Sequence, residues 1–506
     1  MGVVVGRVRC VSPKASMLKQ FIVVSALSAA LCGATSVEAQ RPAPGAPSRV
    51  HVSEDGHFLV TADGRPYFYL GDTGWELFHR LTRDDAVRYL QFRADQGYTA
   101  IQAVLLSEFD GLTVPNAYGD LPLIGRDPTR PAITPGADPA SAAQYDYWDH
   151  VDFIVREAEK RGLHVAMLPT WGRWVNNPQT PADVVFDERN AEAYGRFVGA
   201  RYKDHPIIWV LGGDRHTDGV EKVWRAMARG IAIGTSGRED YAGVTMTFHP
   251  CGACTSSTAF HDDPWLDFNM QQTSHGLAVP TRSWSRIAAD YTRTPAKPVV
   301  DGEPLYEDHP LDFRAALNGY SFDAHVRQRA YWDIFAGAVG ITYGNHAVWQ
   351  FYAPDRPPIN GPLMYWTAAI HRPGAAQFPL LRRLVESRPY FSRVPDQSIV
   401  ADTLTGADHV QATRGDGYLF VYSAQGRPFD LVMGKISGDS VAAWWFNPRS
   451  GDATSIGRFA NTGTRTFTPP SQGFGSDWVL VADDASKRFA APGAPTGRTR
   501  GDITPR

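Results

Sequence analysis

Residues 207–216 have the sequence IIWVLGGDRH, in which an uninterrupted apolar run ends in two glycines and a polar cluster. A strand that is covered on both faces needs such a run, because neither of its faces meets water. The polar residues then stand at the carboxyl end of the strand. The same order, followed by a helical stretch, begins at residue 67 and recurs along the chain. The stretch therefore predicts one unit of a repeated strand–helix architecture.

Eight apolar runs have this order, which is a full set for a closed barrel. Strands that alternate with helices form parallel sheets, and active sites are built at the carboxyl ends of barrel strands. An open doubly wound sheet shares the alternation, but its ligands gather at one switch point, so it needs no polar cluster after every strand. We therefore predict the α/β class and a (β/α)8 TIM barrel. The runs are residues 67–70, 100–106, 164–168, 207–211, 243–248, 267–270, 298–300 and 338–343.

The regions on either side of the barrel differ in composition. We expect the barrel over residues 49–392, preceded by a Pro- and Ala-rich linker over residues 41–48. After it the apolar period changes to two, with short runs between Gly, Asp, Asn and Pro. This pattern predicts a small all-β sandwich over residues 393–486. Residues 487–506 are rich in Pro, Gly, Thr and Arg and predict a disordered tail.

Residues 1–40 resemble a targeting segment more than a fold. Basic residues precede a short apolar run and small residues, which predicts a signal peptide, with Met17 as an alternative start. The run is shorter than the roughly 20 apolar residues that a membrane-spanning helix needs. Cys32 follows Leu31, a poor neighbour for lipidation. We therefore expect export to the periplasm or the cell exterior, in preference to a lipoprotein anchor, and no membrane span.

The composition excludes several kinds of partner. The formal net charge is -3, which gives no electrostatic argument for nucleic acid. No P-loop and no G-x-G-x-x-G after a strand is present, so the sequence predicts no nucleotide cofactor. Aromatic residues make up 12% of the chain. Their flat faces stack on the apolar faces of sugars, although a large aromatic core explains the same number equally well.

Two carboxyl groups follow the fourth and seventh runs, at Asp214 and Glu303. Cleavage of a glycosidic bond needs one carboxyl group that donates a proton and another that attacks carbon or activates water. We predict Asp214 as the acid/base and Glu303 as the nucleophile of a retaining reaction. The structural alternatives are a helix N-cap for Asp214 and an ion pair with a barrel arginine for Glu303. Asp301 shares a strand face with Glu303, and we expect it to orient a neighbour.

Further polar and aromatic residues at the strand ends are candidates for binding sugar hydroxyls or stacking on rings. The histidines among them also suggest a metal-dependent hydrolase. Metal-dependent barrels of the amidohydrolase type, however, carry a His-x-His pair on the first strand, where this chain has Gly71-Asp72-Thr73. We therefore predict no metal and no cofactor. The candidates are Asp72, Trp75, Glu108, Trp171, Arg215, His216, His249, Gln271, His275, His346 and Trp349.

Cys251 and Cys254 form a C-x-x-C pair in the predicted mature chain. A zinc site needs further ligands, so in an exported protein we expect a local disulfide that stiffens one loop. A redox role is the alternative, but no thioredoxin-like pattern surrounds the pair.

Several long stretches resemble the apiosidase-like proteins of glycoside hydrolase family 140. The resemblance runs from about residue 50 to residue 392, and the following region resembles the C-terminal domain, labelled collagen-binding, that such proteins often carry. The matching stretches are residues 71–82 (GDTGWELFHRLT), 115–122 (PNAYGDLP), 168–172 (LPTWG), 209–215 (WVLGGDR), 264–270 (PWLDFNM), 301–304 (DGEP) and 346–350 (HAVWQ).

The resemblance implies a barrel that cleaves glycosidic linkages. The family's known activity is on apiose linked to galacturonic acid in the pectin rhamnogalacturonan II, so we expect a polysaccharide or oligosaccharide substrate from plant cell walls. Its catalytic residues are an Asp in a Gly-Gly-Asp motif and a Glu in an Asp-Gly-Glu-Pro motif, which fall on Asp214 and Glu303. The Cys251–Cys254 loop is not a feature of this resemblance.

Two rival functions have weaker support. The chain is a noncatalytic carbohydrate- or matrix-binding protein if the C-terminal domain does the work, but the two carboxyl groups argue against this. A protease is suggested only by the collagen label, and the sequence has neither a Ser/His/Asp motif nor H-E-x-x-H.

Overall fold

The computed structural model describes residues 47–276 and 282–494. The predicted signal peptide, most of the linker and the last residues of the tail therefore lie outside the described residues. Among the residues that are described, no helix has the length and apolar character needed to cross a bilayer.

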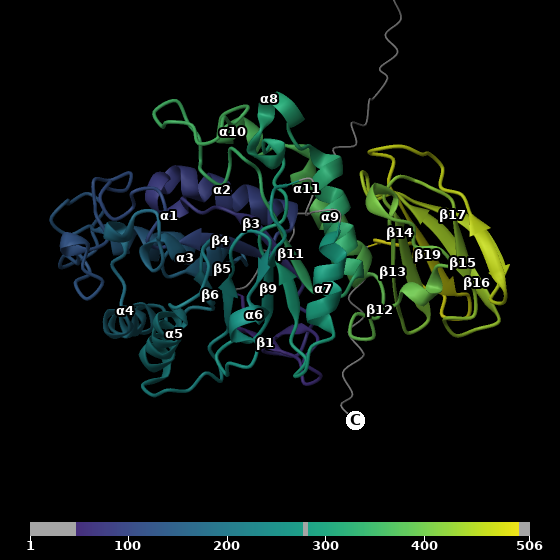
Figure 1. Cartoon of the computed structure of the whole chain (residues 1–506), viewed down its shortest axis with the longest axis horizontal. Helices are drawn as coiled ribbons and strands as arrows, with labels where there is room; N and C mark the ends of the chain where they lie inside the picture. The colour runs from purple at the N-terminus through teal and green to yellow at the C-terminus, as the bar shows by residue number, and fades with distance from the viewer. Residues whose placement is uncertain (1–46, 277–281, 495–506) are drawn as a thin grey trace, which may run out of the picture. The chain divides into compact units, whose positions relative to one another are not determined.

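The centre of the molecule is a nearly closed barrel sheet (Figure 1). In the described residues its strand order is β7-β6-β5-β4-β3-β11-β10-β9-β8, and all pairs are parallel except β8 with β9. The two ends of the sheet approach each other where the backbone N–H of Asp267, two residues before β9, donates to Met246 O of β7 at 2.9 Å. The predicted barrel is confirmed. The strands are β3 (Tyr69–Thr73), β4 (Ala100–Val104), β5 (His164–Leu168), β6 (Ile208–Gly212), β7 (Met246–His249), β8 (Cys254–Thr255), β9 (Asn269–Gln272), β10 (Val299–Asp301) and β11 (Gly340–Tyr343).

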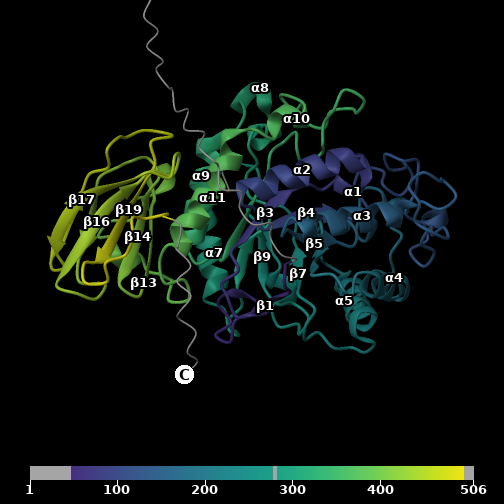
Figure 2. The ribbon, with the colours of Figure 1, turned by 180° about the vertical axis from the view of Figure 1, so that it is seen from behind.

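Helices follow the strands and cover the outside of the barrel, as the view from behind also shows (Figure 2). Helix α2 begins where Thr82 accepts a hydrogen bond from the backbone N–H of Asp85, and it ends at Gly97 in the left-handed region. The helices are α1 (Leu77–Arg80), α2 (Arg83–Gln96), α3 (Tyr147–Lys160), α4 (Glu188–Arg201), α5 (Glu221–Ser236), α6 (Ser257–Phe260), α7 (Ser283–Tyr291), α8 (Ala315–Asn318), α9 (Asp323–Phe335), α10 (Trp366–Ala369) and α11 (Pro373–Glu386).

A short hairpin, β1 (Val50–Val52) with β2 (Leu59–Thr61), precedes the barrel. The C-terminal region contains a six-stranded antiparallel sheet of order β12-β13-β14-β19-β16-β17 and a two-stranded sheet, β15-β18. The strands are β12 (Val394–Pro395), β13 (Val410–Gly415), β14 (Tyr418–Ser423), β15 (Phe429–Val432), β16 (Ser440–Phe446), β17 (Ala453–Ala460), β18 (Thr464–Phe467) and β19 (Trp478–Asp484).

Alternate residues of β14 belong to different cores, because successive side chains on a strand point to opposite faces. Phe420 and Tyr422 pack with the barrel core, where their rings stack on Phe335 and Tyr331 of α9. Leu419 and Val421 belong to the separate core between the two C-terminal sheets. The six-stranded sheet is therefore covered on both faces.

Buried ion pairs join this sheet to the barrel helices. Arg327 of α9 donates from Nη2 to Asp477 at 2.7 Å, and Arg388 donates from Nη2 to Asp483 at 2.7 Å. The predicted disorder after residue 486 is wrong for residues 487–494. Pro492 and Gly493 are buried, and Gly493 O accepts from Arg383 at 2.9 Å.

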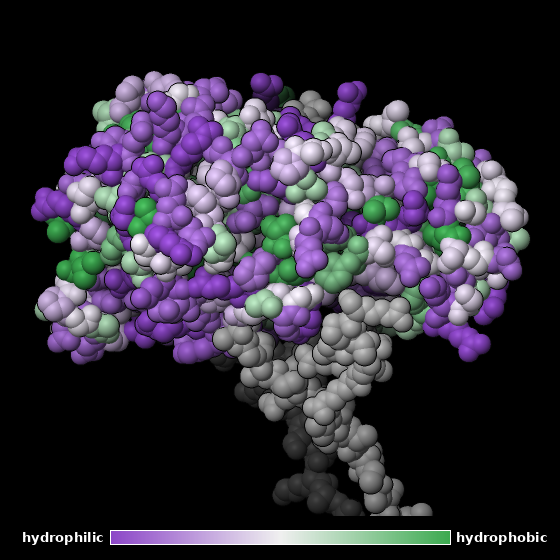
Figure 3. Space-filling model, turned by 90° about the horizontal axis from the view of Figure 1, so that it is seen from below, coloured by the Kyte–Doolittle hydropathy of each residue, from purple (hydrophilic) through white to green (hydrophobic). Residues whose placement is uncertain are grey.

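The face of the molecule seen from below is mainly hydrophilic (Figure 3). Hydrophobic residues appear there in small scattered groups, as on the surfaces of ordinary soluble domains. Among its described residues, this face therefore shows no large apolar patch that would mark a binding surface.

Candidate active site

A cavity of about 510 Å³ opens at the carboxyl ends of the barrel strands. Its size is within the roughly 300–1,000 Å³ typical of small-ligand pockets. Two carboxyl groups from the middle of the chain, Asp214 and Glu303, and a third, Glu108, face it together. The lining residues are Trp75, Glu108, Phe109, Trp171, Asp214, Gly252, Gln272, Ser274, His275, Glu303, Tyr306, His309, Phe313, Trp349, Ile359 and Asn360.

Glu303 follows β10 and is held by two histidines. His275 Nε2 lies 3.0 Å from Oε1, and His249 Nε2 lies 2.9 Å from Oε2. Burial disfavours the charged carboxylate, but the hydrogen bonds and positive charge of these histidines outweigh it and hold the pKa of Glu303 well below its usual value. The structure thus pairs Glu303 with histidines instead of the arginine of the structural alternative.

His249 has an acceptor on each side of its ring. Nδ1 lies 3.1 Å from the carbonyl oxygen of Pro250, and Nε2 faces the carboxylate of Glu303. A carbonyl oxygen only accepts hydrogen bonds. Nδ1 is therefore the donor in its contact with Pro250, and this contact orients the ring so that Nε2 faces the carboxylate of Glu303.

Asp214 stands after a turn that only glycines allow. Gly212, Gly213 and Asp214 have φ values of 96°, 122° and 59°, all in the left-handed region. A Cβ on Gly212 would lie 2.2 Å from His249 O, and one on Gly213 would lie 2.8 Å from the ring of Trp171. The Gly-Gly pair thus lets the chain turn tightly against two neighbouring strand ends. Asp214 does not cap a helix, because α5 begins at Glu221 after Val220.

The surroundings of Asp214 favour its protonated form, in contrast to those of Glu303. Burial raises the pKa of Asp214, and the negative charge of Glu303 raises it further. A hydrogen bond from Gln272 Nε2 at 3.1 Å and the charges of His249 and Arg215 oppose this shift. The two carboxyl groups of one cavity therefore have pKa values displaced in opposite directions, which is the pattern of an acid paired with an ionised group.

Arg215 contacts the carboxyl groups of both Glu108 and Asp214. Arg215 Nη2 lies 3.4 Å from Glu108 Oε1, and Nη1 lies 3.5 Å from Asp214 Oδ2. Burial is the main cause that raises the pKa of Glu108, to about 8. At neutral pH Glu108 therefore carries a proton and is able to donate a hydrogen bond into the cavity.

Three predicted tryptophans line the cavity. Trp171 Nε1 is buried and has no hydrogen-bond partner among the described residues. Trp75 Nε1 donates to Tyr306 at 3.1 Å, and Trp349 Nε1 donates to His346 at 3.3 Å. Buried indole N–H groups usually have a partner, so Trp171 is left with a donor for a ligand.

Six predicted binding residues are not among those that line the cavity. Arg215 and His249 still contact carboxyl groups that face it, whereas the other four lie elsewhere. Asp72 is fully buried on the helix side of the barrel, where Arg93 Nε donates to it at 2.7 Å, so its predicted contact with sugar is wrong. Gln271 and His216 line a neighbouring cavity. His346 lies behind Trp349 and donates to Asn360 O at 3.1 Å. Asp301, expected to orient a neighbour, accepts from Thr273 Oγ1 at 2.6 Å.

Several residues that line the cavity are not among the predicted ones. Gln272 is adjacent to the predicted Gln271, and the strand register decides which of the two faces the cavity. Tyr306, His309 and Phe313 follow β10 in a loop that turns back over the barrel mouth, where the rings of His275 and His309 stack at 4.3 Å. All three lie within ten residues of Glu303 in the sequence, so their position after the DGEP stretch is the signal that indicates them.

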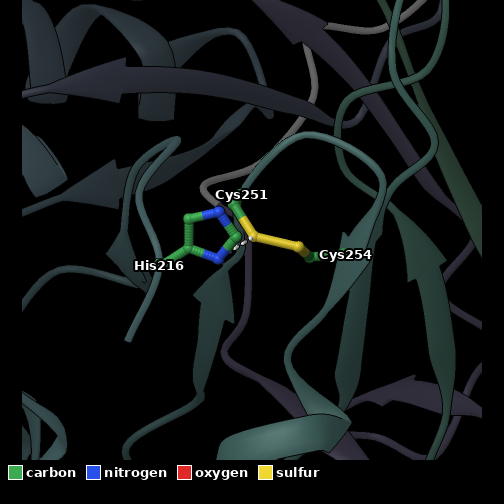
Figure 4. Close-up of side chains that lie close together, drawn as sticks. All are labelled: His216, Cys251 and Cys254. Carbon is green, nitrogen blue, oxygen red and sulfur yellow. Dashed lines mark hydrogen bonds between the residues drawn. A yellow bond between two sulfur atoms is a disulfide. The ribbon is translucent and has the colours of Figure 1, made fainter. Parts of the chain in front are cut away.

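Cys251 and Cys254 form a disulfide in the loop after β7, and His216 Nδ1 lies 3.4 Å from Cys251 Sγ (Figure 4). The ligand atoms of these three residues lie within 4.8 Å of one another. Both sulfur atoms are used by the disulfide, so this arrangement stiffens the loop and leaves His216 as the available metal ligand.

Comparison with known proteins gives one family for most of the chain. The family model described as "Apiosidase-like, catalytic domain" matches residues 53–392, and the model described as "Putative collagen-binding domain of a collagenase" matches residues 394–483. No curated protein matches the chain.

Two solved structures are similar over nearly their whole length. One, described as a glycoside hydrolase, is 35% identical, with a TM-score of 0.78, over 88% of this chain and 98% of its own. The other, a glycoside hydrolase family 5 protein from Bacteroides vulgatus ATCC 8482, is 35% identical, with a TM-score of 0.77, over 88% of this chain and 95% of its own.

Proposed function

The chain belongs to the apiosidase-like family and is a glycoside hydrolase, and from this premise we propose that it acts by a retaining mechanism with Asp214 as acid/base and Glu303 as nucleophile. The observation that carries the proposal is the opposite displacement of the two pKa values in one cavity. A proton donor and an ionised carboxylate are the two groups that this reaction needs.

In the first step, Asp214 donates its proton to the glycosidic oxygen while a Glu303 oxygen attacks the anomeric carbon. The bond between that carbon and the leaving oxygen breaks, and a glycosyl ester forms on Glu303. In the second step, Asp214 takes a proton from water, whose oxygen attacks the same carbon and releases Glu303. Two displacements at one carbon retain its configuration.

The electrostatics of the cavity suit both steps. The histidines keep Glu303 ionised and ready to attack. Burial and the charge of Glu303 raise the pKa of Asp214, which suits its role as the proton donor. Once Glu303 is esterified this charge is lost, so the pKa of Asp214 falls and the carboxylate becomes a suitable base for water.

For the substrate, we propose a plant cell-wall polysaccharide or a related glycan, with apiosyl linkages of rhamnogalacturonan II as the first candidate. The family match supports this choice. The aromatic lining and the free Trp171 N–H suit a sugar ring and its hydroxyls. The apolar segment near residue 21 and the disulfide further support export to the periplasm or the cell exterior.

A glycan panel that includes rhamnogalacturonan II tests the proposal. We expect the wild type to release sugar with retained configuration, followed by NMR, and Glu303→Gln to lose roughly 10³-fold or more of the rate, because the nucleophile is gone. Glu54→Gln, at an exposed carboxylate outside the lining of both cavities, is the matched control and should keep full activity. Equal rates for wild type and Glu303→Gln would contradict the mechanism.

A further inference from the structure

A second cavity, of about 370 Å³, lies beside the catalytic one and is not needed for the proposed chemistry. Its walls are largely apolar, with Phe248, Pro250, Ala259 and Ala289 among them, and polar groups from Gln271 and Arg286 also line it. Its volume is within the range of small-ligand pockets.

The disulfide loop separates the two cavities. Gly252 lines the catalytic cavity, whereas Cys251, Ala253 and Cys254 line the second one. The side chains of the consecutive residues Gln271 and Gln272 also face different cavities, as alternation along a strand requires. The disulfide, with His216 against Cys251, keeps this thin partition in place (Figure 4).

Two polar groups of the second cavity are available to a ligand. The amide nitrogen of Gln271 donates to Asp290 at 2.5 Å, which fixes the side chain, and its buried carbonyl oxygen has no partner among the described residues. Gln271 is only 1% exposed, so an acceptor left unpaired there is costly without a ligand or water. The half-buried side chain of Arg286 has no ion pair within residues 47–276 and 282–494.

We propose that the second cavity is an accessory subsite that holds a neutral sugar residue of the substrate beside the bond that is cleaved. Apolar walls suit the C–H faces of a sugar, and the amide oxygen and the guanidinium suit its hydroxyls. Arg286 and Asp218 give the lining charges of both signs, which favours a polyhydroxylated ligand over an ion.

Arg215 connects this subsite to the chemistry. It lines the second cavity, and its Nη1 lies 3.5 Å from Asp214 Oδ2. Arg215 therefore borders the subsite on one side and the acid/base on the other. The inference rests on the proposed hydrolase function, and it assigns a branched or extended glycan as the substrate in place of a single terminal sugar.

Binding of the inactive variant Glu303→Gln to an array of plant cell-wall glycans tests the subsite. In this background, Arg286→Ala should lower the affinity for the bound glycans roughly tenfold. Thr258→Trp, which adds bulk at an exposed lining position, should lower it similarly. Arg286→Lys should restore part of the affinity, and Arg282→Ala, outside the lining of the cavity, should leave it unchanged.

The outcomes separate this inference from the proposed function. If no glycan binds, or if Arg286→Ala and Thr258→Trp bind as tightly as their parent while thermal melting shows that all are folded, the subsite is refuted. If binding depends on Arg286 but the wild type hydrolyses none of the bound glycans, the subsite is supported and the proposed reaction is contradicted.

Discussion

The mouth of the barrel and the C-terminal sheets differ in whether their buried polar atoms have hydrogen-bond partners. Around the catalytic cavity, Trp171 Nε1, Gln272 Oε1 and His275 Nδ1 are buried without a partner. In the described residues from 394 on, no buried side-chain nitrogen or oxygen is left in this state. Arg327 and Arg388, for example, meet both oxygens of Asp477 and Asp483.

This difference indicates which region is built for a ligand. Unpaired buried polar atoms cost free energy unless something binds them. The barrel mouth also holds Asp214 in a left-handed conformation, a strain that tends to occur at functional sites. The C-terminal domain has the features of a structural partner, so changes in the two regions should have separable effects on activity and stability.

The largest effect on activity is expected from Asp214→Asn. The amide keeps the shape of the side chain but removes the proton donor, so kcat should fall by about 10²–10⁴-fold. The melting temperature should stay the same or rise, because burial disfavours a charge at this position. Initial rates and calorimetry check both parts, and a fall in stability equal to that of a core variant would break the comparison.

The largest effect on stability is expected from Asp477→Ala. This change leaves Arg327, which is 1% exposed, without its main partner, and removing one member of a buried pair costs about 3–5 kcal/mol. Denaturant unfolding measures the loss, while kcat below the transition should be unchanged. The control is Asp408→Ala, which breaks an exposed ion pair. The side chains of Arg427 and Asp408 are 54% and 39% exposed, so the loss of this pair should lower the free energy of unfolding by at most about 1 kcal/mol.

A smaller effect, on the pH dependence of the rate, is expected from His249→Gln. The pKa of Glu303 is depressed in the folded protein, so its ionised form is present above that pKa and is lost as the pH falls through it. Without the His249 charge the pKa rises, and the acid limb of the pH–rate profile should move to higher pH. His371→Gln, at an exposed position, is the control. An unchanged acid limb in His249→Gln would show that this histidine does not hold the nucleophile ionised.

The smallest effect on the rate is expected from Glu108→Gln. Because the pKa of Glu108 is raised to about 8, glutamine resembles its protonated form, and rates at neutral pH should change little. Above pH 8 the wild type gains a negative charge beside Asp214 that the variant lacks. The pH–rate profile of the variant should therefore lose any inflection near pH 8, and a large loss of rate at pH 6 would instead assign Glu108 a direct catalytic role.

The strong strand pattern made the barrel predictable from sequence. All eight apolar runs became strands because continuous burial leaves little choice of structure. In the C-terminal domain the ATSIGRFA sequence of β17 does not itself predict a strand, since it is partly exposed at the sheet edge and has no clear apolar alternation.

The candidate site was only partly predictable. The register of a strand and the face to which a side chain points are decided by tertiary structure. Asp72 and Glu303 both follow apolar residues near strand ends, yet Asp72 turns to Arg93 behind the sheet and Glu303 turns to the cavity. The choice between Gln271 and Gln272 depends on one step of register. The left-handed turn at Asp214 was signalled by its two preceding glycines.

The most direct test of the central claim is rapid-quench mass spectrometry of Asp214→Asn turning over a substrate with a good leaving group. Such a substrate needs no proton donor for the first step, whereas the second step lacks its base, so the glycosyl ester should accumulate. We expect the mass of one sugar residue on the peptide that contains Glu303. An adduct on another peptide, or steady turnover to an inverted product without any adduct, would contradict the assignment of Glu303 as nucleophile.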